Sequence, residues 1–202
     1  MHTVNQIVDI VTHVTSKPRS RVSLLARRLT DGGVLPKSSG RHIKLVDRSA
    51  AVALLFTAAR ADRVEDAVST SKEFAALPYQ RHVGGYDPVE NKTGKTAGAI
   101  FYQFAVQPNL TLAQCLDVLL APDADRRCTL SLSRDVGGQP SAVVKIHTET
   151  GVSSSVLFYQ DSDAKSRSRE TFELSADDFD ALRDLLAREG GVSFTGGGTG
   201  AR

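Results

Sequence analysis

Ten side chains between residues 17 and 44 are of the types that contact nucleic acid. Arginine can donate two parallel hydrogen bonds to a guanine edge, lysine and arginine neutralise phosphates, and serine hydroxyls bind bases or phosphates. The ten are Lys17, Arg19, Ser20, Arg21, Ser23, Arg27, Arg28, Lys37, Arg41 and Lys44. The alternative is that they form a solvated basic surface without a partner. Which alternative holds depends on whether the fold places them on one exposed face.

The positive charge of the chain is concentrated in its first 60 residues. That part holds ten Lys or Arg and three Asp residues, a formal net charge of +7, whereas residues 61–202 hold fifteen Lys or Arg and twenty Asp or Glu, a net charge of −5. The net charge of +2 for the whole chain hides this asymmetry. Because lysine and arginine release condensed counterions when they approach phosphates, a basic module of this size favours a polyanionic partner.

Two helices are predicted to position most of these side chains. Valine and isoleucine recur at helical spacing over residues 3–15, and Pro18 lies in a turn at residues 16–20 that ends this helix. We expect Ser20 to cap a second helix, which Gly32 and Gly33 end. Its apolar face is formed by Val22, Leu25, Ala26 and Leu29. The opposite face presents Ser20, Ser23, Leu24 and Arg27, with Arg21 and Arg28 at its flanks.

A small hairpin and a third helix are predicted to follow. Residues 34–35 and 43–45 are interpreted as two short extended segments around a polar loop that begins at Pro36. The side chains of Lys37, Ser38, Ser39, Arg41 and Lys44 would contact the DNA backbone or the minor groove from this hairpin. Asp47 is expected to cap a strongly apolar helix over residues 50–59. Residues 60–77 have helical character, with a break expected near residues 69–71.

This order of elements resembles the N-terminal winged helix-turn-helix of MerR-type regulators and excisionase-like proteins. The resemblance is carried by Gly33-Val34-Leu35-Pro36-Lys37, by Gly40-Arg41-His42-Ile43, and by Asp47 followed by Ala50, Val52, Leu54 and Phe56. The resemblance covers about residues 4–60. The chain departs from the family in two respects: His42 stands where the family usually has tyrosine, and no long coiled coil is evident after residue 60. The resemblance implies that the second helix enters the major groove with its N-terminal residues on base edges, and that the hairpin contacts the backbone. It implies nothing about metal or drug sensing.

The rest of the chain predicts an α+β arrangement, a small antiparallel sheet domain with two helices. Residues 1–62 form the expected winged helix-turn-helix domain, 63–98 a helical and loop linker, 99–189 the α+β domain and 190–202 a disordered tail. The strands are expected at 100–106, 128–133, 142–148, 156–159 and 171–174. One helix is expected after Thr111 and the other after Ser175, because each residue is a favourable cap.

No enzymatic chemistry is predicted. The five histidines are scattered, no Gly-x-Ser-x-Gly motif is present, and Cys115 and Cys128 lack metal-ligand spacing, so we expect no catalytic residue, metal or cofactor. Both cysteines are interpreted as buried small side chains in a reducing compartment. Since no run of apolar residues is long enough for a membrane span and no signal peptide is evident, we expect a cytoplasmic protein of bacterial or phage origin without a membrane partner.

The hypothesis that follows is a protein that binds double-stranded DNA, a transcriptional regulator or a phage-type accessory factor. We expect a homodimer, because two heads match two half-sites, and the C-terminal domain would mediate association, sense a ligand or contact a protein partner. One alternative is an oligomeric packaging protein like the small terminase subunits of phages, which combine a helix-turn-helix with an oligomerisation region. The other is an adaptor whose winged helix binds protein.

Overall fold

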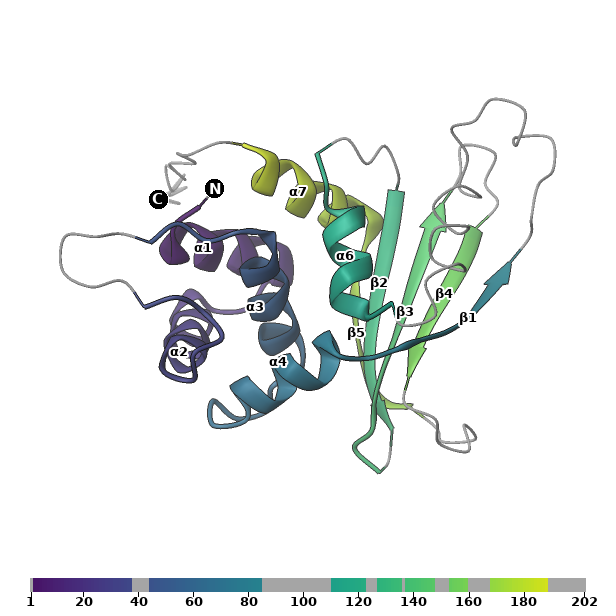
Figure 1. The fold of residues 1–202 in the computed structure, drawn as a ribbon, viewed down its shortest axis with the longest axis horizontal. Coiled ribbons are helices and arrows are strands. Elements are labelled where there is room, and N and C mark those ends of the chain that lie inside the picture. The colour runs from purple at the N-terminus through teal and green to yellow at the C-terminus, as the bar shows by residue number, and fades with distance from the viewer. Residues whose placement is uncertain are drawn as a thin grey trace, which may run out of the picture.

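The computed structural model describes residues 2–37, 44–84, 110–122, 127–135, 137–147, 153–159 and 168–188. Its elements are α1 (Val4–Thr15), α2 (Arg19–Asp31), α3 (Arg48–Arg60), α4 (Ala67–Ala75), β1 (Tyr79–Gly84), α6 (Leu112–Leu119), β2 (Arg127–Asp135), β3 (Pro140–His147), β4 (Ser153–Tyr159), β5 (Ser168–Leu174) and α7 (Ala176–Ala187). Figure 1 shows α1 to α4 gathered on one side of the molecule and the strands on the other. In the described part of the chain, no helix is both long and apolar enough to span a membrane.

The five strands form one antiparallel sheet in the order β1-β4-β3-β2-β5. In β2, Cys128, Leu130 and Leu132 are buried while the residues between them are more exposed, because alternate side chains of a strand point to opposite faces. The buried face packs toward the helices, with α7 against β2 and α4 against β3. The expected α+β class is therefore confirmed. Both cysteines are buried and neither forms a disulfide bond, and burial raises the pKa of the Cys115 thiol.

One continuous hydrophobic core joins the helices to the sheet, from Ile7 in α1 to Leu186 in α7. Phe74 of α4 lies at the centre of this junction. Its ring centroid is 6.0 Å from that of Phe56 in α3, and the Arg134 guanidinium of β2 lies 5.3 Å from the ring centroid of Phe74. Arg134 also pairs with Glu73 at 2.7 Å. The helical N-terminal part thus shares its core with the sheet.

Local signals in the sequence correctly predicted most elements. The helices expected at residues 3–15, after Thr111 and after Ser175 are α1, α6 and α7, and both expected caps form. Asp47 accepts a hydrogen bond from the Ala50 amide at 3.2 Å and caps α3. A hydrogen bond from the Ser49 hydroxyl holds the pKa of this carboxyl below its ordinary value. The strands expected within residues 128–174 are β2 to β5; the expected strand at 100–106 and the tail at 190–202 lie outside the described residues.

Two expectations for residues 60–98 were wrong. Residues 69–71 do not break a helix but lie within α4, where the Ser69 hydroxyl bonds back to the carbonyl of Asp66 at 3.0 Å instead of disrupting the turn. The break lies at residues 61–66. Tyr79–Gly84, expected to belong to a linker, is strand β1, which pairs with β4. This pairing joins residues about seventy positions apart in the sequence, so no pattern among neighbouring residues predicts it.

Two further corrections concern the ends of α2. Its N-cap is Pro18, and because the helix begins at Arg19, Ser20 lies within the first helical turn without a capping role. At the other end, Gly33 has a φ of 73° and its amide donates to Thr30, while the Val34 amide donates to the carbonyl of Leu29. This pair of bonds is a Schellman motif that closes the helix. Residues 34–35 therefore do not form the expected strand.

The second expected strand is also absent where it is described. Residues 44–45 are not in a strand, and Val46 instead forms an isolated antiparallel bridge with His2. Its two hydrogen bonds, 2.7 and 3.2 Å long, attach the start of α3 to the start of α1. Residues 38–43, the tip of the expected hairpin, lie outside the described part of the chain.

Candidate nucleic-acid interface

Helix α2 is the outermost of the described helices. It packs on α1, α3 and α4, and in Figure 1 it lies at the end away from the sheet. Its buried side chains are Val22, Leu25, Ala26 and Leu29, the apolar face expected from the sequence. The close approach to α4 depends on a residue without a side chain, since a Cβ at Gly32 would lie 2.4 Å from a methyl carbon of Val68. The inner face of α2 is thereby fixed, and its opposite face is turned outward.

We define the outer face of α2 as Ser20, Ser23, Leu24, Arg27 and Arg28. All but the half-buried Ser23 are exposed, and their spacing of three and four residues places them along one side of the helix. The guanidinium groups of Arg27 and Arg28 bond to no other described residue, so both are available to a partner. Leu24 is 53% exposed. Asp31 is also exposed at the C-terminal end of this side.

Arg19 is held by a carboxylate within the protein. Its Nε donates to the Oδ1 of Asp9 at 2.6 Å, which ties the start of α2 to α1. This hydrogen bond, together with the charge of Asp9, raises the pKa of the Arg19 guanidinium. Because Asp9 already neutralises it, Arg19 is a poorer candidate for a DNA contact than the sequence suggested.

Arg21 points away from the outer face and toward the end of α3. Its Nη2 donates to the carbonyl oxygens of Ala61 at 2.7 Å and Asp62 at 3.1 Å. These carbonyls follow the last turn of α3, where helical backbone acceptors lack partners. Arg21 therefore satisfies the end of a neighbouring helix, a role that its position beside the apolar face did not indicate.

Replacing Arg21 with alanine is expected to reduce stability. The variant loses two hydrogen bonds from a charged donor and leaves a half-buried helix end without them, so we expect Arg21→Ala to lower the free energy of unfolding by about 1.5 to 3 kcal/mol. Arg28→Ala, which removes an exposed arginine of the same helix, should change it by less than about 0.5 kcal/mol. Urea denaturation of both variants checks this. Equal losses in the two variants would contradict the assigned role of Arg21.

The remaining predicted contacts are distributed around this helix. Lys37 is exposed six residues after the end of α2, and Lys44 is exposed before α3. Lys17, half-buried in the turn between α1 and α2, lines a pocket instead of the outer face. Arg41 lies outside the described residues, so its expected role in a hairpin has no structural description.

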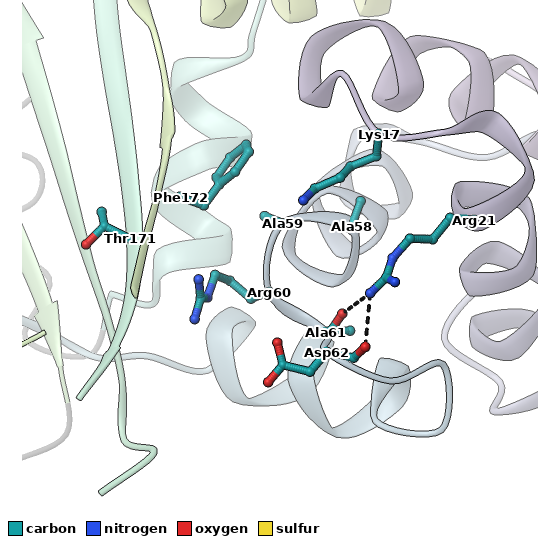
Figure 2. A pocket seen from close by; sticks show the side chains of 9 residues that line it. All are labelled: Lys17, Arg21, Ala58, Ala59, Arg60, Ala61, Asp62, Thr171 and Phe172. Atoms are coloured by element: carbon teal, nitrogen blue, oxygen red, sulfur yellow. Dashed lines mark hydrogen bonds between the residues drawn. The ribbon is translucent and has the colours of Figure 1, made fainter. Parts of the chain in front are cut away.

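Sequence reasoning missed the pocket itself and Arg60, which lines it. The pocket has a volume of about 430 Å³ and lies between the α1–α2 turn, the end of α3 and β5. Figure 2 shows Lys17, Arg21 and Arg60 around it, with Asp62, Thr171 and Phe172. Arg60 is only 8% exposed. One signal in the sequence could have indicated Arg60, because this arginine ends an otherwise apolar helix, Ala50–Ala59. A buried arginine needs polar surroundings.

Metal-binding residues do not gather in the part of the chain that the structure describes. No three His, Cys, Asp or Glu side chains there lie close enough together to hold an ion. Cationic side chains gather in two places, on the outer face of α2 and in the pocket. Neither a protein-family model, nor a curated protein, nor a solved structure matches this chain.

Proposed function

We propose that this protein binds duplex DNA through the outer face of α2, as a transcriptional regulator or phage-type accessory factor. The observation that carries the proposal is the pair of exposed arginines, Arg27 and Arg28, on the outermost helix. Arginine suits guanine, the hydroxyls of Ser20 and Ser23 suit bases or phosphates, and an exposed leucine can contact a thymine methyl group. The side chains of the outer face thus match the chemistry of a major groove.

The size and charge of the N-terminal region support the same proposal. Helix α2 has 13 residues and is about 20 Å long, and a helix of this kind fits the width of the major groove. The first 60 residues carry a net charge of +7, which attracts a polyanion over a longer range. Lys37 and Lys44 are exposed and lie close in sequence to the two ends of residues 38–43, so they can add phosphate contacts beside α2.

The assembly we propose is a homodimer, since two copies of α2 would engage two half-sites of a symmetric target. The sheet region would provide the association surface or the contact to a protein partner. Such a protein would act in the cytoplasm of a bacterium, where the DNA lies. In this proposal the protein binds DNA and does not catalyse a reaction.

A second candidate function is a protein-binding adaptor. It is favoured by one observation, the exposure of Leu24 in the middle of the outer face. An apolar side chain flanked by arginines is also typical of protein–protein contacts. The two functions use the same face of α2 and differ in the partner.

The test is the salt dependence of binding to labelled duplex DNA, measured by fluorescence anisotropy. If the protein contacts about four phosphates, its affinity should fall about 100-fold between about 50 and about 200 mM salt. Binding without salt dependence, or no binding to any duplex in a random pool, would contradict the proposal and favour the adaptor. Mass measurement of the complex distinguishes a dimer from the large ring expected of a packaging protein.

A further inference from the structure

We propose that the pocket between the α1–α2 turn, the end of α3 and β5 binds a small organic phosphate. We call it the junction pocket. The residues used in the argument are Lys17, Arg21, Arg60, Asp62 and Phe172. The proposal goes beyond DNA binding and does not depend on it, since it concerns a concave site on the flank of α2 and not the outer face.

The charges that line the junction pocket favour a dianion. Three cationic side chains and one carboxylate, that of Asp62, surround a single cavity. A phosphate monoester carries a charge of about −1.5 to −2 at neutral pH, which suits a cavity lined by Lys17 and Arg21. The cations come from three places in the fold, the α1–α2 turn, α2 and α3. Figure 2 shows Lys17 extending toward Ala58 and Ala59, and Arg60 extending from α3 toward β5.

Arg21 is fixed in a position to help bind the phosphate. Its Nη2 is held by the carbonyls of Ala61 and Asp62, which orders the guanidinium before a ligand arrives. A guanidinium has five N–H donors, and no other described residue occupies those on Nε and Nη1. Each of these remaining N–H groups can donate one charge-assisted hydrogen bond to a phosphate oxygen. An ordered arginine costs less conformational entropy on binding than a mobile one.

The size and the walls of the pocket indicate that the phosphate carries an organic group. A volume of about 430 Å³ lies within the range of pockets for small organic ligands and exceeds what a bare phosphate fills. The half-buried ring of Phe172 and the methyl groups of Ala58 and Ala59 form an apolar wall. The Asp62 carboxylate, exposed at the rim, can accept a hydrogen bond from a hydroxyl group. A sugar phosphate or a nucleoside monophosphate has this combination of groups.

The experiment is an NMR titration of the full chain with AMP, with inorganic phosphate and with adenosine. We expect AMP to shift the amides of Ala59 and Ala61 together with those of Thr171 and Phe172, because both segments line the junction pocket. Phosphate should produce the same shifts with weaker binding, and adenosine should produce none at the same concentrations. Lys17→Gln should weaken AMP binding about tenfold, the loss of one charge-assisted hydrogen bond, whereas Lys17→Arg should retain it.

Control variants keep the outcome interpretable. Lys72→Gln removes an exposed lysine of α4 that does not line the pocket and should leave AMP binding unchanged. Lys17 is the better test than Arg60, because replacing a buried arginine can unfold the protein. The absence of shifts with AMP, equal shifts with adenosine, or an unchanged affinity in Lys17→Gln would each overturn the proposal. Displacement of AMP by duplex DNA from the same amides would also overturn it, because the phosphate would then belong to DNA.

Discussion

Arg27→Ala combined with Arg28→Ala is expected to weaken binding to duplex DNA about 100-fold. Two arginine contacts to bases or phosphates together contribute about 3 kcal/mol, since a good arginine–base pair is worth about 1–3 kcal/mol. Both side chains are exposed and bond to no other described residue, so the fold should not change. The measurement is anisotropy at fixed salt, with thermal denaturation to verify that the variant is folded.

The salt dependence shows which atoms of DNA the two arginines contact. If both bind phosphates, the slope of log affinity against log salt should fall by about 2, and all sequences should lose affinity equally. If they contact base edges, the slope should change little while sequence preference relaxes. If the affinity falls while neither the salt slope nor the sequence preference changes, the effect does not come from direct contact between the two arginines and DNA.

A matched control separates the outer face of α2 from net charge. Arg63→Ala with Lys72→Ala also removes two exposed cations, from the loop before α4 and from α4 itself. We expect this control to change affinity by less than about threefold, the effect of a distant screened charge. Equal losses in the two double variants would mean that α2 is not the DNA-binding helix. Leu24→Ala separates the two candidate functions, because it removes the apolar contact and leaves Arg27 and Arg28 in place. An adaptor should lose its protein partner in this variant.

The sequence predicts what local chemistry determines. Caps at Asp47, Thr111 and Ser175 and the apolar face of α2 depend on residues within one or two turns, so they could be identified correctly. The end of α2 was also identified, yet the amides of Val34 and Leu35, which a hairpin strand would need, both donate to the carbonyl of Leu29 at that end. The hydrogen bonds that close the helix are therefore also the reason why the expected strand does not form.

The candidate site was predictable only in part, because contacts between distant segments determine where a side chain points. Arg21 lies at the flank of the apolar face and could equally face water or α3. It faces α3 because that helix ends at Arg60 and leaves the carbonyls of residues 61 and 62 without partners, a fact absent from the sequence near residue 21. Arg27 and Arg28 are exposed, as expected, because none of the described elements covers that side of α2.

Phe74→Ala is expected to have the largest effect on stability. The side chain is fully buried and contacts Phe56 from α3 and the Arg134 guanidinium from β2. Its loss should lower the free energy of unfolding by about 3–5 kcal/mol, the usual cost of removing a core phenylalanine. That is a large part of the total stability of about 5–15 kcal/mol that a protein of this kind has. Phe74→Leu, which keeps most of the volume, should cost less than about 1.5 kcal/mol.

The same variant tests whether the helical N-terminal part and the sheet unfold together. The chain has no tryptophan, and its four tyrosines all lie after residue 62, two of them in β1 and β4, so tyrosine fluorescence reports on the part of the chain after residue 62. Far-ultraviolet ellipticity is dominated by the helices, more than half of whose described residues are in α1, α2 and α3. Because Phe74 lies in a core that both parts share, the two urea midpoints should coincide and shift together in Phe74→Ala. If ellipticity kept its midpoint while the tyrosine signal moved, residues 1–62 would be an independent domain, and the shared core would not couple them.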